Sequence, residues 1–488
     1  MQGIKEEVSL LFQQYSSLSI NRIDKIPQSG SDRTYFRIIC EQGKDNAPKT
    51  YIATYGRNIK ENGTFINFSR HFKKKEAPVP LIYIVNNQET IYIQEDFGDS
   101  SLMNELELHG HNDYVYSLFK KSLKALAHMQ INGSEGLNYK WCITSRRFGK
   151  QAIISDLLYF KYYFLDTLQI PYDKEKLIDD FDALGTYLSH VDHQYFMFRD
   201  FQSRNVMIEN EEVHFIDYQG GMKGALQYDV ASLLWQAKAE LSDEWKNDLL
   251  EYYMNCVEDI LRKPLDRMRF VGQYNGYVLI RLLQVMGAYG FRGLFERKAH
   301  FLTSIPLALR NIKWFISNKQ LGISLPEFER LLNLMTEDEV IHRFEPIRAN
   351  ASTPLIVKIN SFSYLKSGYP KDATMNGGGF VFDCRGILNP GRIEEFKKLT
   401  GRDKFVQEYL EQQTKMPDFL NSIYNILDIA VENYIQRGFE SLMINFGCTG
   451  GQHRSVYAAD AVVRHLRNKF GVKIDLHHIE QDIHETKT

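Results

Sequence analysis

The hydrophobic pattern changes twice along the chain, and these changes limit the possible folds more than any other feature. The first hundred residues hold short runs rich in β-branched and aromatic residues, a pattern typical of strands, with one helical stretch between them. The next two hundred place apolar residues at three- and four-residue spacing, which predicts helices. Beyond about residue 350, strand-like and helix-like runs alternate, as in an α/β domain. We predict an α/β multidomain protein with these parts: a bilobal protein-kinase-like unit with a β-rich lobe (1–100) and a helical lobe (101–330), a linker (331–350), and a small α/β domain with a phosphate-binding loop (351–488).

Charge and cysteine content narrow the class of protein. The net charge is −2, from 59 basic and 61 acidic residues, so no overall basic field recruits nucleic acid. The five cysteines are scattered without a Cys-x-x-Cys pair, which argues against a zinc or disulfide framework. The N-terminal segment has the pattern of an amphipathic helix rather than a signal peptide, and no uninterrupted apolar run approaches ~18 residues. We expect a cytoplasmic protein without a membrane partner.

The segment FRDFQSRNVMIENEEVHFIDYQGG (198–221) carries the clearest chemical signal. Asp200 is followed five residues later by Asn205, and Asp217 ends a short apolar strand. Phosphoryl transfer needs one carboxylate that orients the attacking hydroxyl, and an amide and a second carboxylate that hold Mg²⁺ against the ATP phosphates. The spacing is that of a kinase catalytic loop and metal loop. The sequence therefore predicts ATP and Mg²⁺ as cofactors, Asp200 as the catalytic base, and Asn205 and Asp217 as metal ligands.

This segment resembles the aminoglycoside and choline kinase group, whose loop reads His-x-Asp-x-x-x-x-Asn. The phrase RDFQSRN is especially similar to anomeric sugar kinases that phosphorylate N-acetylmuramic acid or N-acetylglucosamine at the 1-hydroxyl. Three more segments match that subgroup in order: GSDRTYFRI (30–38), EDFGD (95–99) and YDVASLL (228–234). The resemblance covers roughly residues 1–330. It implies a phosphate loop, a hinge whose backbone faces adenine, and a helix in which Asp229 braces the catalytic loop.

Two departures from the kinase pattern concern nucleotide binding. Phe198 stands where the catalytic loop usually has histidine, and Thr54 stands where protein kinases place a strand lysine that holds the phosphates. Arg33 or Arg37 could supply that positive charge, and Glu61 on the following helix then has a partner other than lysine or is simply solvated. The residues expected to bind the nucleotide are Ser29, Gly30, Ser31, Asp32, Arg33, Arg37, Gln94 and Glu95.

A second candidate site is the loop FGCTGGQHRSV (446–456), which joins an apolar strand to a helix. Its glycines allow the backbone to approach a ligand, and the helix start directs N–H groups at the same place. Arg454 adds a fork of donors that matches phosphate. The loop therefore predicts an anion site, most naturally for a phosphate ester.

The same region is similar to the C-terminal domain of RapZ, the bacterial RNase adapter that senses glucosamine-6-phosphate. The matching segments follow one order, over about residues 354–480: SFSYLKSGYP (361–370), FVFDCRGILNP (380–390) and LTGRDKFVQEYL (399–410). In RapZ a P-loop domain precedes this domain, whereas here the kinase-like unit does. RapZ-like proteins have His after Asn-Pro, where this chain has Gly391, so that contact is lost or moved to Arg392. Residue matching implies that the sugar phosphate is bound by Arg385, Thr449, Gly450, Gly451, His453 and Arg454.

Three other interpretations remain open at this stage. Cys448 and Arg454 have the Cys-x₅-Arg spacing of cysteine phosphatases, in which a thiolate attacks bound phosphate. His477, His478 and His484 could chelate a metal ion, although a polar tail is the preferred interpretation. Three tyrosines of one helical stretch line either the substrate pocket or the core: Tyr159, Tyr162 and Tyr163.

Both resemblances point to amino sugars. We expect an ATP-dependent kinase that acts on an amino sugar, at the anomeric hydroxyl, with a C-terminal domain that binds a hexosamine phosphate. Self-association is implied by the likeness to RapZ. The alternative is a non-catalytic sensor or adapter that uses a pseudokinase scaffold and acts on a protein or RNA partner, although no feature of the sequence supports such a partner.

Overall fold

The computed structural model describes residues 2–26, 33–42, 48–296, 299–345, 347–374 and 379–487. It divides into two compact units. The first comprises Met1–Phe291 and Ser304–Ile341, and the second comprises Arg292–Thr303 and His342–Thr488.

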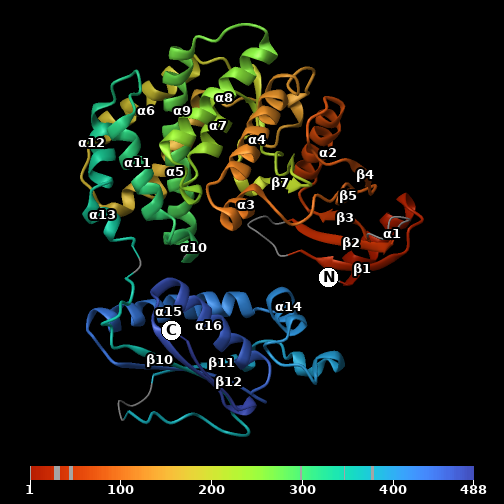
Figure 1. The fold of residues 1–488 in the computed structure, drawn as a ribbon, viewed down its shortest axis with the longest axis vertical. Helices are drawn as coiled ribbons and strands as arrows, with labels where there is room; N and C mark the ends of the chain where they lie inside the picture. Colours follow the sequence, from red (N-terminus) through yellow and green to blue (C-terminus); the bar gives the residue numbers. More distant parts are fainter. Residues whose placement is uncertain are drawn as a thin grey trace. The chain divides into compact units, whose positions relative to one another are not determined.

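The first unit begins with an antiparallel sheet in the strand order β1-β2-β3-β5-β4 (Figure 1). Val8 and Phe12 of the first helix are buried in one cluster with Phe36 and Ile93 of the sheet, so this helix covers one sheet face. The elements of this lobe are α1 (Gln2–Tyr15), β1 (Ile20–Lys25), β2 (Thr34–Gln42), β3 (Pro48–Tyr55), α2 (Ile59–Lys74), β4 (Ile82–Val85) and β5 (Ile91–Glu95).

Helix α2 positions Glu61, whose carboxylate lies beside Arg33. Asn58 caps its first turn by accepting a hydrogen bond from the Glu61 N–H (3.2 Å), and a glutamate in the first turn also suits the helix dipole. Phe65 stacks on Tyr92 of β5 (5.4 Å between ring centroids) and on Tyr218 (5.0 Å), next to Asp217. The helix is thereby fixed to both the sheet and the metal loop.

The rest of the first unit is mostly helical, and two short antiparallel pairs lie within it: β6 with β9 and β7 with β8. In Figure 1 the green helices α7, α8 and α9 lie together at the centre of this lobe. The helices are α3 (Leu102–His109), α4 (Asp113–Ile131), α5 (Lys150–Tyr163), α6 (Lys174–Ser189), α7 (Leu226–Leu234), α8 (Asp243–Leu261), α9 (Arg267–Tyr289), α11 (Ile305–Asn318), α12 (Pro326–Met335) and α13 (Asp338–His342). The strands are β6 (Tyr195–Met197), β7 (Val206–Glu209), β8 (Glu212–Phe215) and β9 (Met222–Gly224).

Helix α9 is the central helix of this lobe and packs against α5, α7 and α11. The helical stretch Arg267–Phe295 is long and apolar enough, by length and composition, to cross a membrane, but 56% of its most apolar window is buried inside the fold. A core helix passes the same test. Because α9 is a core helix, its charged side chain Arg281 lies in the interior of the lobe.

The second unit is a sheet in the order β11-β12-β10-β13-β14, parallel except for the last strand. Helices α15 and α16 pack against each other, and α16 also packs on β10, β12 and β13 (Figure 1). The elements are α10 (Ala299–Leu302), β10 (Ile356–Ser363), β11 (Phe380–Asp383), α14 (Lys404–Gln413), α15 (Met416–Gln436), β12 (Ser441–Cys448), α16 (Arg454–Phe470), β13 (Lys473–His478) and β14 (Ile483–Lys487).

The predicted fold class, a bilobal kinase-like unit followed by an α/β domain, is confirmed. One local expectation is wrong: the histidines near the C-terminus do not form a polar tail. His477 and His478 belong to β13, His484 belongs to β14, and the two strands pair in an antiparallel hairpin. His478 is fully buried, and its Nδ1 lies 2.8 Å from the Ser361 hydroxyl oxygen. The alternating apolar residues of this segment, such as Ile474 and Leu476, provide the buried face of the hairpin.

Candidate functional site

The catalytic loop lies between β6 and β7, and α7 supports it from within the lobe. Asp229 of α7 is fully buried, and its carboxylate accepts hydrogen bonds from the N–H groups of Phe198 (2.7 Å) and Arg199 (3.0 Å) and from the Gln130 amide (2.9 Å). Burial raises the pKa of Asp229 to about 7, although these three donors oppose the shift. Arg199 has a φ of +80°, which is unfavourable for a non-glycine residue. Through its two hydrogen bonds to backbone N–H groups, Asp229 holds the loop in this conformation, which is the bracing role expected of it.

The two expected metal ligands lie on adjacent segments of the loop region. The Asn205 amide donates to the Asp200 carbonyl oxygen (2.9 Å), and the Asn205 carbonyl accepts from the Ile216 N–H (3.1 Å). Asp217 follows Ile216 directly and has a left-handed φ of +68°. This strained conformation turns the chain sharply at the end of β8. The structure therefore brings Asp200, Asn205 and Asp217 together, within one hydrogen-bonded segment.

The two oxygens of the Asp200 carboxylate have different surroundings. Oδ1 accepts from Arg281 Nη2 of α9 (3.0 Å) and from Gln202 Nε2 (2.5 Å). Oδ2 receives one long contact, 3.5 Å from Arg204 Nη2. The carboxylate is 36% exposed, whereas the Arg281 side chain is only 7% exposed. Oδ1 is thus held by two donors, of which Arg281 is buried, whereas Oδ2 is held only by the long contact to the exposed Arg204.

Arg33 occupies the place of the missing strand lysine. Its side chain is 4% exposed and lies 3.0 Å from Asp217 Oδ1 and 3.4 Å from Glu61 Oε1. Burial disfavours the guanidinium charge, but the neighbouring Tyr92, Tyr35, Asp217 and Glu61 outweigh it and raise the pKa of Arg33. Glu61 is therefore paired with an arginine rather than solvated. These contacts link α2 to the metal loop.

Arg37 is used differently from Arg33. Its guanidinium binds Asp96 through Nε (2.7 Å) and Nη2 (3.0 Å) and Asp99 through Nη1 (2.6 Å). Asp96 is 2% exposed, so this bidentate pair is largely withdrawn from water. Arg37 therefore joins β2 to the hinge segment after β5, and its donors are taken up there rather than at Asp217.

The remaining nucleotide-binding candidates lie at the end of β5 or outside the described residues. Gln94 is 7% exposed, and its side-chain amide oxygen Oε1 has no hydrogen-bond partner within the described part of the chain. The Glu95 carboxylate accepts from the Leu81 N–H (3.1 Å) and lies 3.2 Å from Lys73 Nζ. The phosphate-loop candidates lie outside the described residues: Ser29, Gly30, Ser31 and Asp32.

In the second unit, the phosphate-loop candidates lie where β12 ends and α16 begins. Gly451 has a φ of +67°, and an added Cβ would lie 2.2 Å from Glu480 Cγ, so only glycine fits there. Thr449 and Gly450 are exposed at the tip. The Thr449 carbonyl accepts from the Ser363 hydroxyl at the end of β10 (2.6 Å). The loop is thus an exposed turn anchored at the carboxyl end of two parallel strands, where ligands bind in α/β sheets.

Arg454, at the first position of α16, joins this loop to the segment that follows β11. It is 4% exposed and donates from Nη1 to the carbonyls of Arg385 (3.1 Å) and Ile387 (2.8 Å) and from Nη2 to Thr449 Oγ1 (3.4 Å). Its Nε has no partner within the described residues. The Arg385 side chain stacks on Tyr364 (4.1 Å to the ring centroid) and binds Asp383. The candidate residues therefore gather around one loop, with Arg454 partly committed to structural bonds.

His453 and Cys448 border the same loop. His453 is 7% exposed, and its Nε2 lies 2.9 Å from the Phe396 carbonyl oxygen. A Cβ at Gly391 would approach this ring to 3.3 Å, so the glycine leaves the imidazole room. Cys448 Sγ accepts from the Gly451 N–H (3.2 Å) and lies 3.2 Å from Ser455 Oγ. The thiol faces into the loop, as the phosphatase interpretation requires, so that interpretation stays open.

Two family models match the chain in the two units. A model described as the phosphotransferase enzyme family matches residues 25–263, and a model described as the RapZ C-terminal domain matches residues 355–482. Residues 25–263 therefore resemble a phosphotransferase domain, and residues 355–482 resemble a RapZ C-terminal domain.

Two curated relatives each match less than a third of the chain. A nucleotide-binding protein of Clostridium botulinum is 39% identical over 133 residues, which is 27% of this chain and 43% of that protein. A nucleotide-binding protein of Clostridium kluyveri is 36% identical over 146 residues, 30% of this chain and 48% of that protein. The chain thus spans less than half the length of these relatives.

Two solved structures resemble part of the chain at low identity. An ethanolamine kinase of Plasmodium vivax is 14% identical, with a TM-score of 0.44 over 63% of this chain and 86% of that chain. An amicoumacin kinase in complex with AMP-PNP and Ca²⁺ is 12% identical, with a TM-score of 0.44 over 67% of this chain and 99% of that chain.

Several aromatic residues singled out in the phosphotransferase domain pack in its interior. Phe198, in place of the usual histidine, is fully buried against Phe201 (5.2 Å between centroids) and Tyr218 (5.9 Å). Tyr163 packs edge-on against Phe291 (4.9 Å), and Tyr159 packs against Tyr163 (4.9 Å). Tyr162, by contrast, is 57% exposed.

Sequence patterns alone do not indicate most of the charged residues that surround Asp200 in the phosphotransferase domain. Arg281 reaches it from 81 residues away, on a helix whose pattern looks like ordinary core. Arg199 binds Asp156 of α5 (2.7 Å) and the Tyr228 hydroxyl (2.9 Å). Only Arg204, within the catalytic loop motif, could have been suspected from its position four residues after Asp200.

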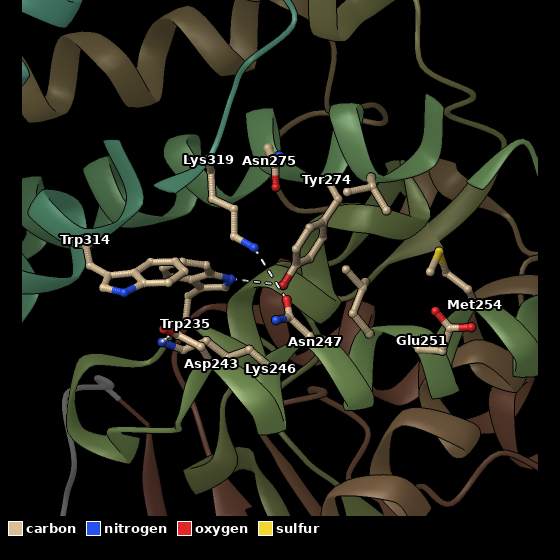
Figure 2. A pocket seen from close by; sticks show the side chains of 12 residues that line it. Trp235, Asp243, Lys246, Asn247, Glu251, Met254, Tyr274, Asn275, Trp314 and Lys319 are labelled. Atoms are coloured by element: carbon tan, nitrogen blue, oxygen red, sulfur yellow. Dashed lines mark hydrogen bonds and ion pairs between the residues drawn. The ribbon is translucent and has the colours of Figure 1, made fainter. Parts of the chain in front are cut away.

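A pocket of about 170 Å³ lies elsewhere in the helical lobe of the phosphotransferase domain. Figure 2 shows Trp235, Trp314 and Tyr274 at its wall, with Lys319 reaching toward Asn247. Neither Asp200, Asn205 nor Asp217 lines it. Gln236, which follows Trp235 in the chain, accepts a hydrogen bond from the hydroxyl of Ser203 in the catalytic loop (2.6 Å). The pocket is therefore distinct from the site where phosphoryl chemistry is expected.

Proposed function

We propose that this chain is an ATP-dependent kinase that transfers the γ-phosphoryl group to an amino sugar, at the anomeric hydroxyl, and that its RapZ C-terminal domain binds a hexosamine phosphate. The observation that carries the kinase proposal is the arrangement of Asp200, Asn205 and Asp217 in one braced segment, with Arg33 bridging Asp217 to Glu61. The choice of an amino sugar rests on the resemblance of the motifs to anomeric sugar kinases and to RapZ.

In this proposal Asp200 is the general base. Its Oδ2, which is held only by the long contact to Arg204, accepts the proton of the acceptor hydroxyl, while the hydroxyl oxygen bonds to the γ-phosphorus and the bond to ADP breaks. Arg281 and Gln202 hold Oδ1, so the carboxylate cannot rotate freely. A fixed base within hydrogen-bond reach is what positioning contributes to such a transfer.

The residues present fit a divalent cation and a nucleotide. Asn205 and Asp217 offer the amide and carboxylate oxygens that Mg²⁺ prefers, and Asp217 is 37% exposed and so open to a ligand. A bound Mg²⁺ supplies positive charge to the β- and γ-phosphates. Arg33, held by two carboxylates, orients Asp217 and adds positive charge on the same side.

The alternative, a non-catalytic sensor on a pseudokinase scaffold, depended on the missing strand lysine. Because Arg33 pairs with both Glu61 and Asp217, the absence of that lysine no longer argues against turnover. Cytoplasmic location and self-association belong to the proposal as well, and rest on the sequence pattern and on the likeness to RapZ. The nucleotide binding in the names of the curated relatives is not carried over, because the match covers less than half of those proteins.

The test of the kinase proposal is ATP turnover with a panel of free amino sugars, with ³¹P NMR to identify the product. We expect Asp200→Asn to lower kcat by about 10²–10⁴, the range for loss of a general base. Asp179→Asn, an exposed carboxylate on α6, is the matched control and should leave kcat unchanged. Full activity of Asp200→Asn, or no phosphorylated sugar with the wild type, would contradict the proposal.

The sugar-phosphate proposal for the second unit has a separate test. Calorimetry with glucosamine-6-phosphate should detect binding to the wild-type chain and at least tenfold weaker binding to Arg454→Met, since a charge-assisted bond contributes about 1.5–3 kcal/mol. Arg437→Met, which removes an exposed arginine at the end of α15, is the matched control. Equal binding by both variants would refute a role for Arg454. Phosphatase activity on an aryl phosphate that disappears in Cys448→Ser would instead favour the cysteine phosphatase.

A further inference from the structure

The pocket of about 170 Å³ in the helical lobe has apolar walls. Figure 2 shows Trp235 and Trp314 on one side of it and Met254 on the opposite side, and Leu250 and Val271 add further apolar surface. Trp235, Leu250 and Met254 are buried. The pocket therefore offers apolar surface to the body of a small ligand.

Helix α8 supplies charged side chains of opposite sign to this pocket. Its lining residues, from Asp243 to Met254, recur at three- and four-residue spacing and so form one stripe along the helix. Lys246 and Glu251 of this stripe are five residues apart, which at a rise of about 1.5 Å per residue separates them by about 7.5 Å along the helix axis. A ligand that lies along α8 therefore meets a cationic group at one end and an anionic group at the other.

The end of the pocket near the tryptophans has an excess of positive charge. The ammonium groups of Lys246 and Lys319 both lie over the ring of Trp314, at 5.5 and 5.4 Å. The Lys246 side chain is 11% exposed, and Asp243 lies 3.7 Å from it. Lys319 contacts the neutral Asn247 Oδ1 (3.4 Å) and, within the described residues, no carboxylate. Burial lowers the pKa of Lys246, and Lys319 adds to this effect whereas Asp243 opposes it. Two ammonium groups thus share one carboxylate.

The opposite end has an excess of negative charge. Glu251 binds Arg267 of α9 (2.6 Å), and the same guanidinium also binds Glu258 (2.5 Å). Two carboxylates thus share one guanidinium, and Glu251, which lines the pocket, is 62% exposed and open to a further partner. The other acidic residues of this part of α8, Glu244 and Asp248, do not line the pocket.

We propose that this pocket binds a small zwitterion whose carboxylate and ammonium are separated by a short apolar chain, with the carboxylate at Lys246 and Lys319 and the ammonium at Glu251. In 6-aminohexanoate the extended chain separates the two charged groups by about 7–8 Å, close to the separation along α8. A cavity of about 150 Å³ holds a group the size of benzene, so this pocket accommodates such a chain but is too small for a nucleotide. The site is separate from the proposed kinase and sugar-phosphate sites, because none of their residues lines it.

The experiment is isothermal titration calorimetry of the full chain with 6-aminohexanoate and three matched probes. Hexanoate lacks the ammonium, hexylamine lacks the carboxylate, and glycine has both charges without the separation. We expect 6-aminohexanoate to bind with a Kd of about 1 mM or lower. Each of the other probes should bind at least about tenfold more weakly, because each loses a charge-assisted contact. Two of the four tryptophans line the pocket, so tryptophan fluorescence provides a second readout.

Two variants assign the two ends of the ligand. Lys319→Gln should weaken binding of 6-aminohexanoate at least about tenfold and leave the affinity for hexylamine unchanged, because hexylamine has no carboxylate to lose. Glu251→Gln should also weaken binding of 6-aminohexanoate at least about tenfold and leave the affinity for hexanoate unchanged. Lys176→Gln, which removes a 72% exposed lysine of α6, is the matched control. Thermal midpoints equal to that of the wild type establish that each variant is folded.

Each outcome supports or overturns the inference. Binding of 6-aminohexanoate that both variants weaken, with the control unchanged, supports it. Hexanoate that binds as well as 6-aminohexanoate overturns it in favour of a site for anions alone, and equal binding of hexylamine overturns it in favour of a site for cations alone. Binding that neither variant changes places the ligand elsewhere on the chain and overturns it. Absence of saturable binding up to about 10 mM overturns it as well.

Discussion

Replacing Arg33 with methionine tests how this chain compensates for the missing strand lysine. Methionine keeps much of the length and the apolar stem of the side chain but removes the charge. The Asp217 and Glu61 carboxylates, which Arg33 contacts at 3.0 and 3.4 Å, then lose their shared cation and repel each other. Because Asp217 is an expected metal ligand, the effect should appear in the use of ATP.

The size of the effect follows from burial. Removing one partner of a buried ion pair costs about 3–5 kcal/mol, because the other charge is left unpaired. Asp217 is 37% and Glu61 24% exposed, so water screens part of this loss. We take about 2–3 kcal/mol as the remaining cost. At about 1.4 kcal/mol for each factor of ten, kcat/KM for ATP should fall about 30- to 150-fold.

The assay is steady-state kinetics with ATP as the varied substrate, and the matched comparison is Arg37→Met. Arg37 pairs with the buried Asp96, so its loss should lower the thermal midpoint and change kcat/KM for ATP much less. Arg33→Lys keeps the charge but cannot span both carboxylates, and should lose about tenfold. A folded Arg33→Met protein whose kcat/KM for ATP stays within threefold of wild type would refute this reasoning.

Three other predictions concern single positions. Arg281→Lys should lower kcat about 10- to 100-fold with KM for ATP unchanged, because Oδ1 of Asp200 loses its buried fork; a change in KM for ATP alone would contradict this. The pKa of Asp229 is about 7 in the folded chain and lower when unfolded, so between these values the folded state binds more protons and stability falls as pH rises. In Asp229→Asn the free energy of unfolding should therefore fall less between about pH 4 and pH 7 than it does in the wild type. An equal fall in both proteins would contradict the raised pKa of Asp229. Gly451→Ala should abolish binding of glucosamine-6-phosphate in calorimetry, whereas Gly438→Ala, with the same φ of +67° but open space around its Cβ position, should cost only about 1–2 kcal/mol of stability and leave binding intact.

The parts of the site that the sequence predicted are those encoded by short spacing. Asp200, Asn205 and Asp217 lie within eighteen residues of one another, in loops that flank the β7–β8 pair and whose geometry depends on local hydrogen bonds. The bracing role of Asp229 was implied by the resemblance of YDVASLL (228–234) to the anomeric sugar kinases. In such a segment the chain itself limits where each side chain can lie, so residue type and spacing were sufficient.

The missed residues are those brought in by packing over long separations. Arg281 meets Asp200 across 81 residues, and Arg33 meets Asp217 across 184. The apolar pattern of α9 predicted a core helix, but no periodicity indicates that one buried arginine of such a helix will face a catalytic carboxylate. The choice between Arg33 and Arg37 was open for the same reason, since both lie at the start of one strand and only the tertiary fold separates their partners.

The charge of Arg33 bears on whether the phosphotransferase domain catalyses phosphoryl transfer or is a kinase fold without activity. A buried ion pair is weak support for a fold, because apolar residues of similar volume often stabilise a protein as well or better. Here the buried cation is held by Glu61 and by Asp217, and Asp217 is left 37% exposed with a strained φ of +68°. A structural role does not explain the strain, since a strained backbone lowers stability. The strain suits a carboxylate that must bind a cation at one oxygen while a guanidinium fixes the other, so the arrangement favours catalysis over a purely structural role.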